Sequence, residues 1–186
     1  MRRLAILLLA WSSVAAGAAP AISAGGLFSV ALESDGRAQA WGMGVYGALG
    51  DGNTTNDRTT VDRSTPVRVV NLNGIVEVSA GSRHVLALTN DGKVWAWGFN
   101  GTGQLGNLSD LYLVTPTEVT GLPPIAKISA GGYHSIALAT DGSVWGWGGN
   151  FVGQLGDGTE TDRRTAIRIA GISDVVAVSA GDEFTM

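Results

Sequence analysis

Apolar positions along this chain come in short runs that turn residues separate. In one stretch, Ile75 to Val78, His84 to Thr89 and Lys93 to Gly98 each have the length and composition of a β-strand. The turn Asn90-Asp91-Gly92 joins the last two as a tight hairpin. The pattern predicts antiparallel strands, and no segment has the 3.6-residue apolar period of a capped helix.

A fourth strand is predicted over Thr117 to Thr120. Pro116 opens this strand, as Pro66 opens its counterpart earlier in the chain. Because proline cannot donate to a β-ladder, we expect this strand at the outer edge of a sheet.

The predicted third strand is apolar on both faces. Trp95 and Trp97 lie on one face, and Val94 and Ala96 lie on the other. Both faces therefore need a cover. Four-stranded sheets stacked face to face in a radial array would provide it, and that is the architecture of a β-propeller.

The same series of residues returns along the chain. Ser-Ala-Gly occurs four times, beginning at Ser23, Ser79, Ser129 and Ser179, at spacings of 56, 50 and 50 residues. Ala-Leu, Asp-Gly, Trp-Gly and Gly-x-Leu-Gly follow the first three copies in the same order. The six extra residues of the first unit fall in a polar loop, 51–64, where added length disturbs no ladder. Such self-similarity indicates a repeat architecture.

The N-terminus has the layout of a secretory signal peptide. Arg2 and Arg3 precede an apolar run, and small residues up to Ala18 follow it. We expect residues 1–18 to be removed, which leaves no membrane span. An uncleaved membrane anchor is disfavoured, because the apolar run is shorter than the roughly 20 residues that cross a bilayer. The expected location is secreted, periplasmic or on the cell surface.

Composition narrows the classes of function. The chain has no cysteine, which excludes disulfides and thiolate chemistry. Its formal charge is −4, and losing Arg2 and Arg3 makes it −6. An acidic chain without a basic patch is not expected to bind nucleic acid.

The third unit carries a specific resemblance. Residues 129–138 read Ser-Ala-Gly-Gly-Tyr-His-Ser-Ile-Ala-Leu, and Asp141-Gly142, Trp147-Gly148 and Gly153-Gln154-Leu155-Gly156 follow. This series resembles the repeat of the regulator-of-chromosome-condensation family, over essentially all of 22–186. The resemblance implies an all-β fold, a seven-bladed β-propeller.

The chain is short for a closed ring of blades of about 50 residues. We divide it into units over 22–77, 78–127 and 128–177 and a partial unit over 178–186, which is three blades and the first strand of a fourth. Open ends would leave strand edges and an apolar face bare. We therefore expect the N-terminal part of a longer protein, with self-association as the minor alternative.

Most residues of the repeat are predicted to be structural. His84 and His134 occupy a position where other units have phenylalanine, so we expect packed side chains rather than ligands or bases. We interpret a further group in the same way, as blade core and close turns: Trp41, Trp97, Trp147, Gly81 and Gly131.

No convincing catalytic, metal or cofactor site emerges. Ser135 and His134 with Asp141 could be imagined as a triad, but Asp141 begins a hairpin turn and the three are not expected to converge. The acidic loops at 51–57 and 157–162 lack the ligand pattern of a calcium loop, so solvated turns are favoured over a calcium site.

One loop departs from the repeat, over 107–114. Its apolar residues Leu108, Leu111, Tyr112 and Leu113 form the candidate contact patch, with Tyr112 as its anchor. The alternative is that these side chains fold back over the outer strand.

Two classes of function follow. The first is an exported, non-enzymatic scaffold that binds a protein or cell-surface component through its loops. The resemblance allows an inhibitor-like role, since secreted propellers of similar repeats inhibit β-lactamases. The second is an attachment platform for an enzyme or lectin-like domain beyond Met186. The family's nuclear member promotes nucleotide exchange on a small GTPase, a role that suits an exported acidic chain poorly.

Overall fold

The computed structural model describes residues 18–53, 62–109 and 111–186. The predicted signal peptide, apart from Ala18, lies outside these residues, as does the middle of the polar loop at 51–64. The described part is built of strands, with one short 3-10 helix, η1 (Val45–Gly47). It contains no helix long and apolar enough to cross a membrane.

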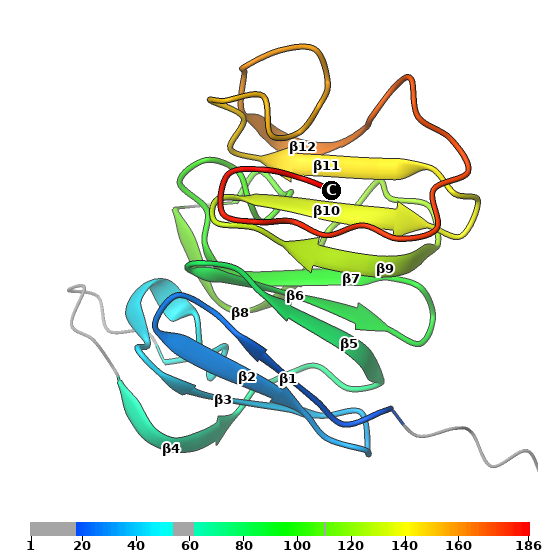
Figure 1. Cartoon of the computed structure of the whole chain (residues 1–186). Coiled ribbons are helices and arrows are strands. Elements are labelled where there is room, and N and C mark those ends of the chain that lie inside the picture. Colours follow the sequence, from blue (N-terminus) through cyan, green and yellow to red (C-terminus); the bar gives the residue numbers. More distant parts are fainter. Residues whose placement is uncertain (1–17, 54–61, 110) are drawn as a thin grey trace, which may run out of the picture.

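The strands form three antiparallel sheets, and each sheet takes four consecutive strands in chain order (Figure 1). We call these sheets blades 1, 2 and 3. Blade 1 holds β1 (Ala21–Ala24), β2 (Phe28–Leu32), β3 (Ala38–Gly42) and β4 (Arg63–Arg68). Blade 2 holds β5 (Ile75–Ala80), β6 (His84–Thr89), β7 (Val94–Phe99) and β8 (Tyr112–Glu118). Blade 3 holds β9 (Ile125–Ala130), β10 (His134–Ala139), β11 (Val144–Gly148) and β12 (Arg163–Arg168).

The sequence predicted the first three strands of blade 2 closely. β6 has the predicted bounds, and the hairpin turn before β7 places Gly92 at φ +79°, a conformation that favours glycine. β5 and β9 begin at Ile75 and Ile125, three residues before the repeat boundaries drawn at 78 and 128. These strands therefore belong whole to the blade that follows.

The fourth strand begins earlier than predicted. β8 starts at Tyr112, so Pro116 lies inside the strand instead of opening it, and Pro66 lies inside β4 in the same way. The physical reason is a register shift: β8 pairs Thr117 with Ala96 and then Leu113 with Gly98. Pro116 lies between these pairs, where the ladder is irregular and an N–H is not required.

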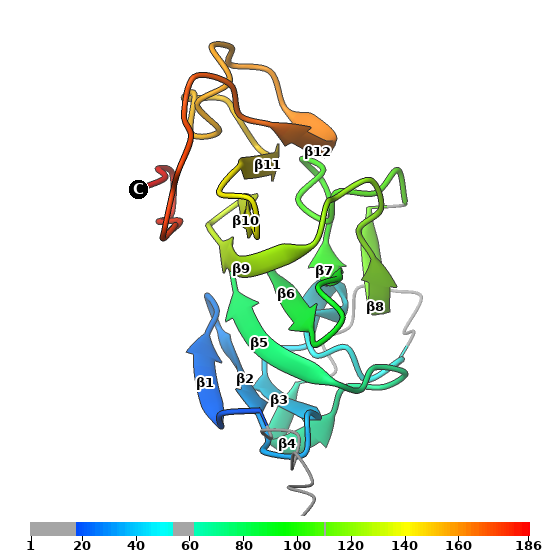
Figure 2. The same ribbon diagram turned by 90° about the vertical axis from the view of Figure 1, so that its right-hand side faces the viewer.

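The blades stack face to face, which covers both faces of the middle sheet (Figure 2). Trp97 points into the core shared by blades 1 and 2, whereas Val94 and Ala96 on its other face join the core shared with blade 3. Trp97 and Ala96 are fully buried. The prediction of stacked sheets that bury both faces of the third strand is confirmed.

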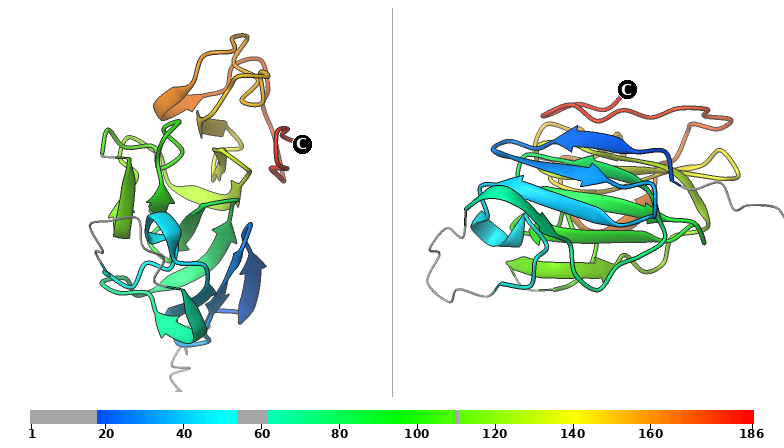
Figure 3. Two further views of the ribbon diagram at one scale, coloured as in Figure 1. Left: turned by 90° about the vertical axis from the view of Figure 1, so that its left-hand side faces the viewer. Right: turned by 90° about the horizontal axis from the view of Figure 1, so that it is seen from below.

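The C-terminal residues begin a fourth unit. Ala180 bridges Thr185 in an antiparallel turn, and Ser179 and Met186 exchange backbone hydrogen bonds. This segment and β1 lie along the same edge of the stack (Figure 3). Three complete blades and the start of a fourth therefore form an open arc, in agreement with the predicted incomplete propeller.

Candidate functional site

The serine in each of the first three Ser-Ala-Gly copies links one unit to the next. Ser23 Oγ accepts a hydrogen bond from the backbone N–H of Ala80 at 3.0 Å. Ser79 receives the same bond from Ala130 at 3.0 Å, and Ser129 receives it from Ala180 at 2.8 Å. The donor is always the alanine of the following copy. The motif is thus a blade junction, which accounts for its recurrence without a ligand.

The glycine of the motif makes room for the histidine ring. A Cβ on Gly81 would lie 2.5 Å from His84 Cε1 and 2.3 Å from the carbonyl oxygen of Gly131. Gly131 stands in the same relation to His134, with Cε1 at 2.3 Å. Any larger residue would displace both the ring and the neighbouring backbone.

Each histidine joins two blades through a hydroxyl group. His84 Nε2 lies 2.9 Å from Ser135 Oγ, and the Ser135 hydroxyl donates to the carbonyl of Gln104 at 2.8 Å. Because that hydroxyl proton is already committed, His84 must donate, which assigns its proton to Nε2. His134 repeats the arrangement with Thr185 at 3.1 Å, and Thr185 donates to Gln154.

Both imidazoles are kept neutral. Burial lowers the pKa of His84 to about 3, and the nearby His134 contributes. Burial lowers the pKa of His134 to about 4, although Asp182 and the backbone at Phe184 act in the opposite direction. The triad considered from sequence is not assembled, because Ser135 contacts His84 and the carboxylate of Asp141 accepts from Ser143.

The acidic loops are held by arginine. Asp51 accepts from Arg63 at 3.0 Å, and Arg163 donates from Nε to Asp157 at 2.7 Å. Burial alone would raise the pKa of Asp157, but hydrogen bonds from Thr159, Arg163 and Asn150 outweigh it and lower the pKa to about 2. Among the described residues, no group of three or more His, Cys, Asp or Glu side chains is placed to hold a metal ion.

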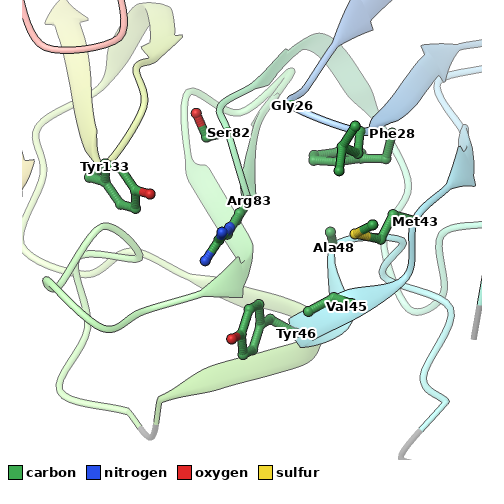
Figure 4. A pocket seen from close by; sticks show the side chains of 10 residues that line it. Gly26, Phe28, Met43, Val45, Tyr46, Ala48, Ser82, Arg83 and Tyr133 are labelled. Atoms are coloured by element: carbon green, nitrogen blue, oxygen red, sulfur yellow. The ribbon is translucent and has the colours of Figure 1, made fainter. Parts of the chain in front are cut away.

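A pocket of about 380 Å³ opens where the three blades meet on one face. Blade 1 contributes Leu27 to its lining. Blade 1 also contributes Tyr46, blade 2 contributes Arg83, and blade 3 contributes Tyr133 (Figure 4). The remaining lining residues are Gly26, Phe28, Met43, Val45, Ala48 and Ser82. The pocket combines apolar walls, two phenol groups and one cation.

Tyr46 is the centre of an aromatic cluster beside this pocket. Its ring lies 4.8 Å from that of Phe99 and 6.3 Å from that of Tyr112, measured between centroids. The guanidinium carbon of Arg83 stands 5.7 Å from the Tyr46 centroid. Tyr46 adopts φ +59°, a left-handed conformation that is costly for a non-glycine residue. Strain of this kind is typical of functional positions.

The structure divides the predicted contact patch. Leu108 and Leu111 are exposed, at 78% and 49%. Tyr112 and Leu113 belong to β8 rather than to a loop, and Leu113 packs against the core between blades 2 and 3. The Tyr112 ring contacts the Tyr46 ring and so belongs to the aromatic cluster beside the pocket. Tyr112 is also exposed, at 37%, so the structure leaves three of the four residues exposed and packs only Leu113.

Sequence reasoning missed the pocket itself. The sequence feature that points to the pocket is the residue directly before the histidine or phenylalanine of each unit. Along the chain this residue is Leu27, Arg83, Tyr133 and Glu183. This position changes in every unit, whereas the Ser-Ala-Gly motif that precedes it by two residues recurs. Variation within a repeat could have identified it, but only the stacked blades show that three of these residues share one pocket.

The comparisons with known proteins agree with this architecture. A family model described as the regulator of chromosome condensation (RCC1) repeat matches residues 35–88, 91–138 and 141–186. A second model of the same repeat matches 21–48, 75–104 and 125–154.

Curated relatives match over part of their length. The ultraviolet-B receptor UVR8 of Arabidopsis thaliana is 40% identical over 85 residues, which cover 46% of this chain and 18% of the receptor. The human E3 ubiquitin-protein ligase HERC2 is 38% identical over 88 residues, which cover 46% of this chain and 2% of the ligase. The chain thus spans less than a fifth of either relative.

Solved structures give the same fold. Prp20p of Saccharomyces cerevisiae matches with a TM-score of 0.79 and 25% identity, over 89% of this chain and 42% of that protein. Human WBSCR16 matches in fold, with a TM-score of 0.61 and 18% identity, over 90% of this chain and 57% of that protein. The repeat models cover most of the chain, and the chain therefore belongs to the regulator of chromosome condensation (RCC1) repeat family.

Proposed function

We propose that this chain is a non-enzymatic scaffold that binds a partner protein on the face bearing the Tyr46–Arg83–Tyr133 pocket. The observation that carries the proposal is the composition of this pocket, which draws arginine and tyrosine from three successive blades. Arginine and tyrosine are the residue types that dominate binding energy at protein interfaces. Prp20p is described as binding Gsp1p and histones, and yeast RCC1 (Prp20) as bound to Kap60, so protein binding has precedent in the family.

The chemistry of the pocket defines the partner group. Arg83 is exposed and forms no ion pair with any described residue. Its guanidinium group is therefore available to a carboxylate of a partner. Leu27 and Met43 supply apolar wall beside it. We expect a partner segment in which Asp or Glu stands next to an aromatic or aliphatic side chain.

Peptide selection tests this function. A random peptide library displayed on phage is selected on the chain, and the affinities of the recovered peptides are measured by fluorescence polarisation. We expect acidic-aromatic peptides, whose binding to Arg83→Met weakens about tenfold to a hundredfold, because a hydrogen bond to a charged group is worth about 1.5–3 kcal/mol. Arg68→Met, which changes an exposed arginine on β4, is the matched control. Equal affinity for the two variants would remove the pocket from the proposal.

The site of action is the second part of the proposal. The N-terminal pattern, with Arg2 and Arg3 before an apolar run and small residues up to Ala18, supports an exported protein that acts outside the cytoplasm, at a cell surface, in a periplasm or in the medium. An inhibitor-like role, in which this face covers a partner's site, is consistent with such a location. N-terminal sequencing of the protein recovered after expression with its own leader tests export. A mature start at Ala19 is expected, and a cytoplasmic protein that keeps Arg2 and Arg3 would refute it.

A further inference from the structure

The connection from β4 to β5, which joins blade 1 to blade 2, carries the pair Asn73-Gly74. The chain contains two Asn-Gly pairs, and the other is Asn100-Gly101. Asparagine is a thermolabile residue. It reacts most readily before glycine, because glycine has no side chain to shield the backbone nitrogen that attacks the asparagine amide. Which of the two pairs reacts depends on how the fold holds each one.

Asn73 is free to react. Its side chain is exposed and forms no hydrogen bond with any described residue. The backbone N–H of Gly74, whose nitrogen would attack, likewise donates to no acceptor in the described part of the chain. Only the carbonyl of Gly74 is engaged, and it accepts from the N–H of Asn90 at 2.9 Å. The attacking nitrogen and the amide that it would attack are therefore both available.

Asn100 is held in place. Its side chain is fully buried. Asn100 Oδ1 accepts from the N–H of Leu105 at 3.0 Å, and Nδ2 donates to the carbonyl of Ser109 at 3.3 Å. Asn100 has to break these bonds and leave the core before it can cyclise, which requires local unfolding of its loop. The two Asn-Gly pairs thus share one chemistry and have opposite surroundings.

The Asp-Gly turns are protected as well. Five Asp-Gly pairs occur in the chain, and aspartate can form the same ring with loss of water. In the fifth pair, the Asp157 carboxylate accepts from Arg163 and from the N–H of Thr159. In the first four pairs, the glycine N–H donates to a backbone carbonyl: Gly36 to Glu33, Gly52 to Val114, Gly92 to Thr89 and Gly142 to Ala139. The pair Asn73-Gly74 has neither form of protection.

This pair also lies between two anchors of the core. Leu72 and Ile75 are both buried in the cluster shared by blades 1 and 2. The N–H of Ile75 donates to the carbonyl of Gly36 at 3.0 Å, which fastens the connection to the hairpin turn of blade 1. The bond from Asn90 to the Gly74 carbonyl fastens it to the hairpin turn of blade 2. A change in backbone length at this place acts on both turns.

We infer that Asn73 is a spontaneous modification site, where deamidation to aspartate and isoaspartate loosens the junction of blades 1 and 2. The Gly74 nitrogen bonds to Asn73 Cγ and the Cγ–Nδ2 bond breaks. Nδ2 leaves as ammonia with the proton that Gly74 lost, and a succinimide ring remains. Water then adds to either ring carbonyl. One opening gives aspartate, and the other gives isoaspartate, whose main chain runs through Cβ and Cγ. No atom is oxidised or reduced, and the side chain gains a negative charge.

Mass spectrometry of tryptic peptides tests the site. The full chain is incubated at mildly alkaline pH, folded in one sample and unfolded in guanidinium chloride in another. Cleavage after lysine and arginine then places the two pairs in separate peptides, 69–83 and 94–127. In the folded sample we expect Asn73 to deamidate at least about ten times faster than Asn100, because Asn100 reacts only after local unfolding. In the unfolded sample we expect similar rates.

Two results of this experiment would overturn the inference. One is an Asn73 that stays intact in the folded protein or reacts no faster than Asn100. The other is a difference in rate that persists in guanidinium chloride, which would assign it to local sequence rather than to the fold. The 69–83 peptide contains its own control, since Asn71 precedes the bulky Leu72 and should remain unmodified.

A matched variant tests the effect on the junction. Asn73→Ser removes the reacting amide and copies Ser173, which stands at the same place in the connection after blade 3. As isoaspartate accumulates, followed with an isoaspartyl methyltransferase assay, we expect the Tm of the unsubstituted protein to fall, because a main-chain carbon is added between Leu72 and Ile75. Asn73→Ser should keep its Tm through the same incubation. Equal losses in both proteins, or an unchanged Tm despite isoaspartate at position 73, would refute the effect on the junction.

Discussion

At the scale of single residues, the recurring serine, glycine and tryptophan are explained by contacts at the junctions between blades. The serine accepts an amide N–H, the glycine admits a ring, and the tryptophan donates to a carbonyl. The histidine position shows how much variation the junction tolerates. Phe28 and Val85 share the core between blades 1 and 2, where the next junction has His84 and Ser135. An apolar pair and a hydrogen-bonded pair thus fill equivalent places.

The two histidines predict that acid weakens the fold. Their folded pKa values, about 3 and about 4, lie below the unfolded value of about 6.5, so the unfolded chain binds protons first as pH falls. The stabilisation is present above about pH 6.5 and is lost as pH falls toward the folded values. Between pH 7 and pH 5 we expect a loss of about 2 kcal/mol for each histidine, measured by urea denaturation.

A double variant isolates one histidine. His84→Phe with Ser135→Val copies the Phe28–Val85 pair, so we expect a folded protein that loses about half of the stability change between pH 7 and pH 5. An unchanged pH dependence would mean that other groups cause it.

At the scale of elements, the outer strand is where sequence reasoning and structure part. The predicted loop at 107–114 ends early, because β8 already begins at Tyr112. Tyr112 and Leu113 pair with Phe99 and Gly98 of β7. The pairing resumes on the far side of an irregular stretch that contains Pro116, and such a shift in register leaves little trace in a pattern of apolar residues. The two inner strands of each blade have two hydrogen-bonded neighbours and pair with each other without a register shift, so their pattern was sufficient.

The two leucines at this boundary should behave differently. Leu113→Ser removes an apolar side chain that packs against the core between blades 2 and 3, so we expect a loss of about 1–3 kcal/mol in the free energy of unfolding. Leu111→Ser changes an exposed side chain and should alter it by less than about 0.5 kcal/mol. Chemical denaturation of both variants measures this difference. Equal losses would place Leu111 in the packing as well.

At the scale of the whole molecule, the fold was predictable and the site was not. Repeats at a fixed spacing, with both faces of the third strand apolar, require stacked sheets, and the stack is present. The Arg83 pocket has no signature within any one unit, because Tyr46, Arg83 and Tyr133 come from three units and converge only when the blades stack.

The histidine–hydroxyl hydrogen bonds between blades limit which blades can be duplicated in tandem. Duplicating blade 2 in tandem would set His84 against Val85, which leaves an imidazole N–H buried without an acceptor. Duplicating blade 3 would set His134 against Ser135, a pair like the one already found between His84 and Ser135. The order of the blades therefore depends on which side chains meet at each junction. Of blades 2 and 3, only blade 3 can be followed by a copy of itself without leaving a histidine N–H unpaired.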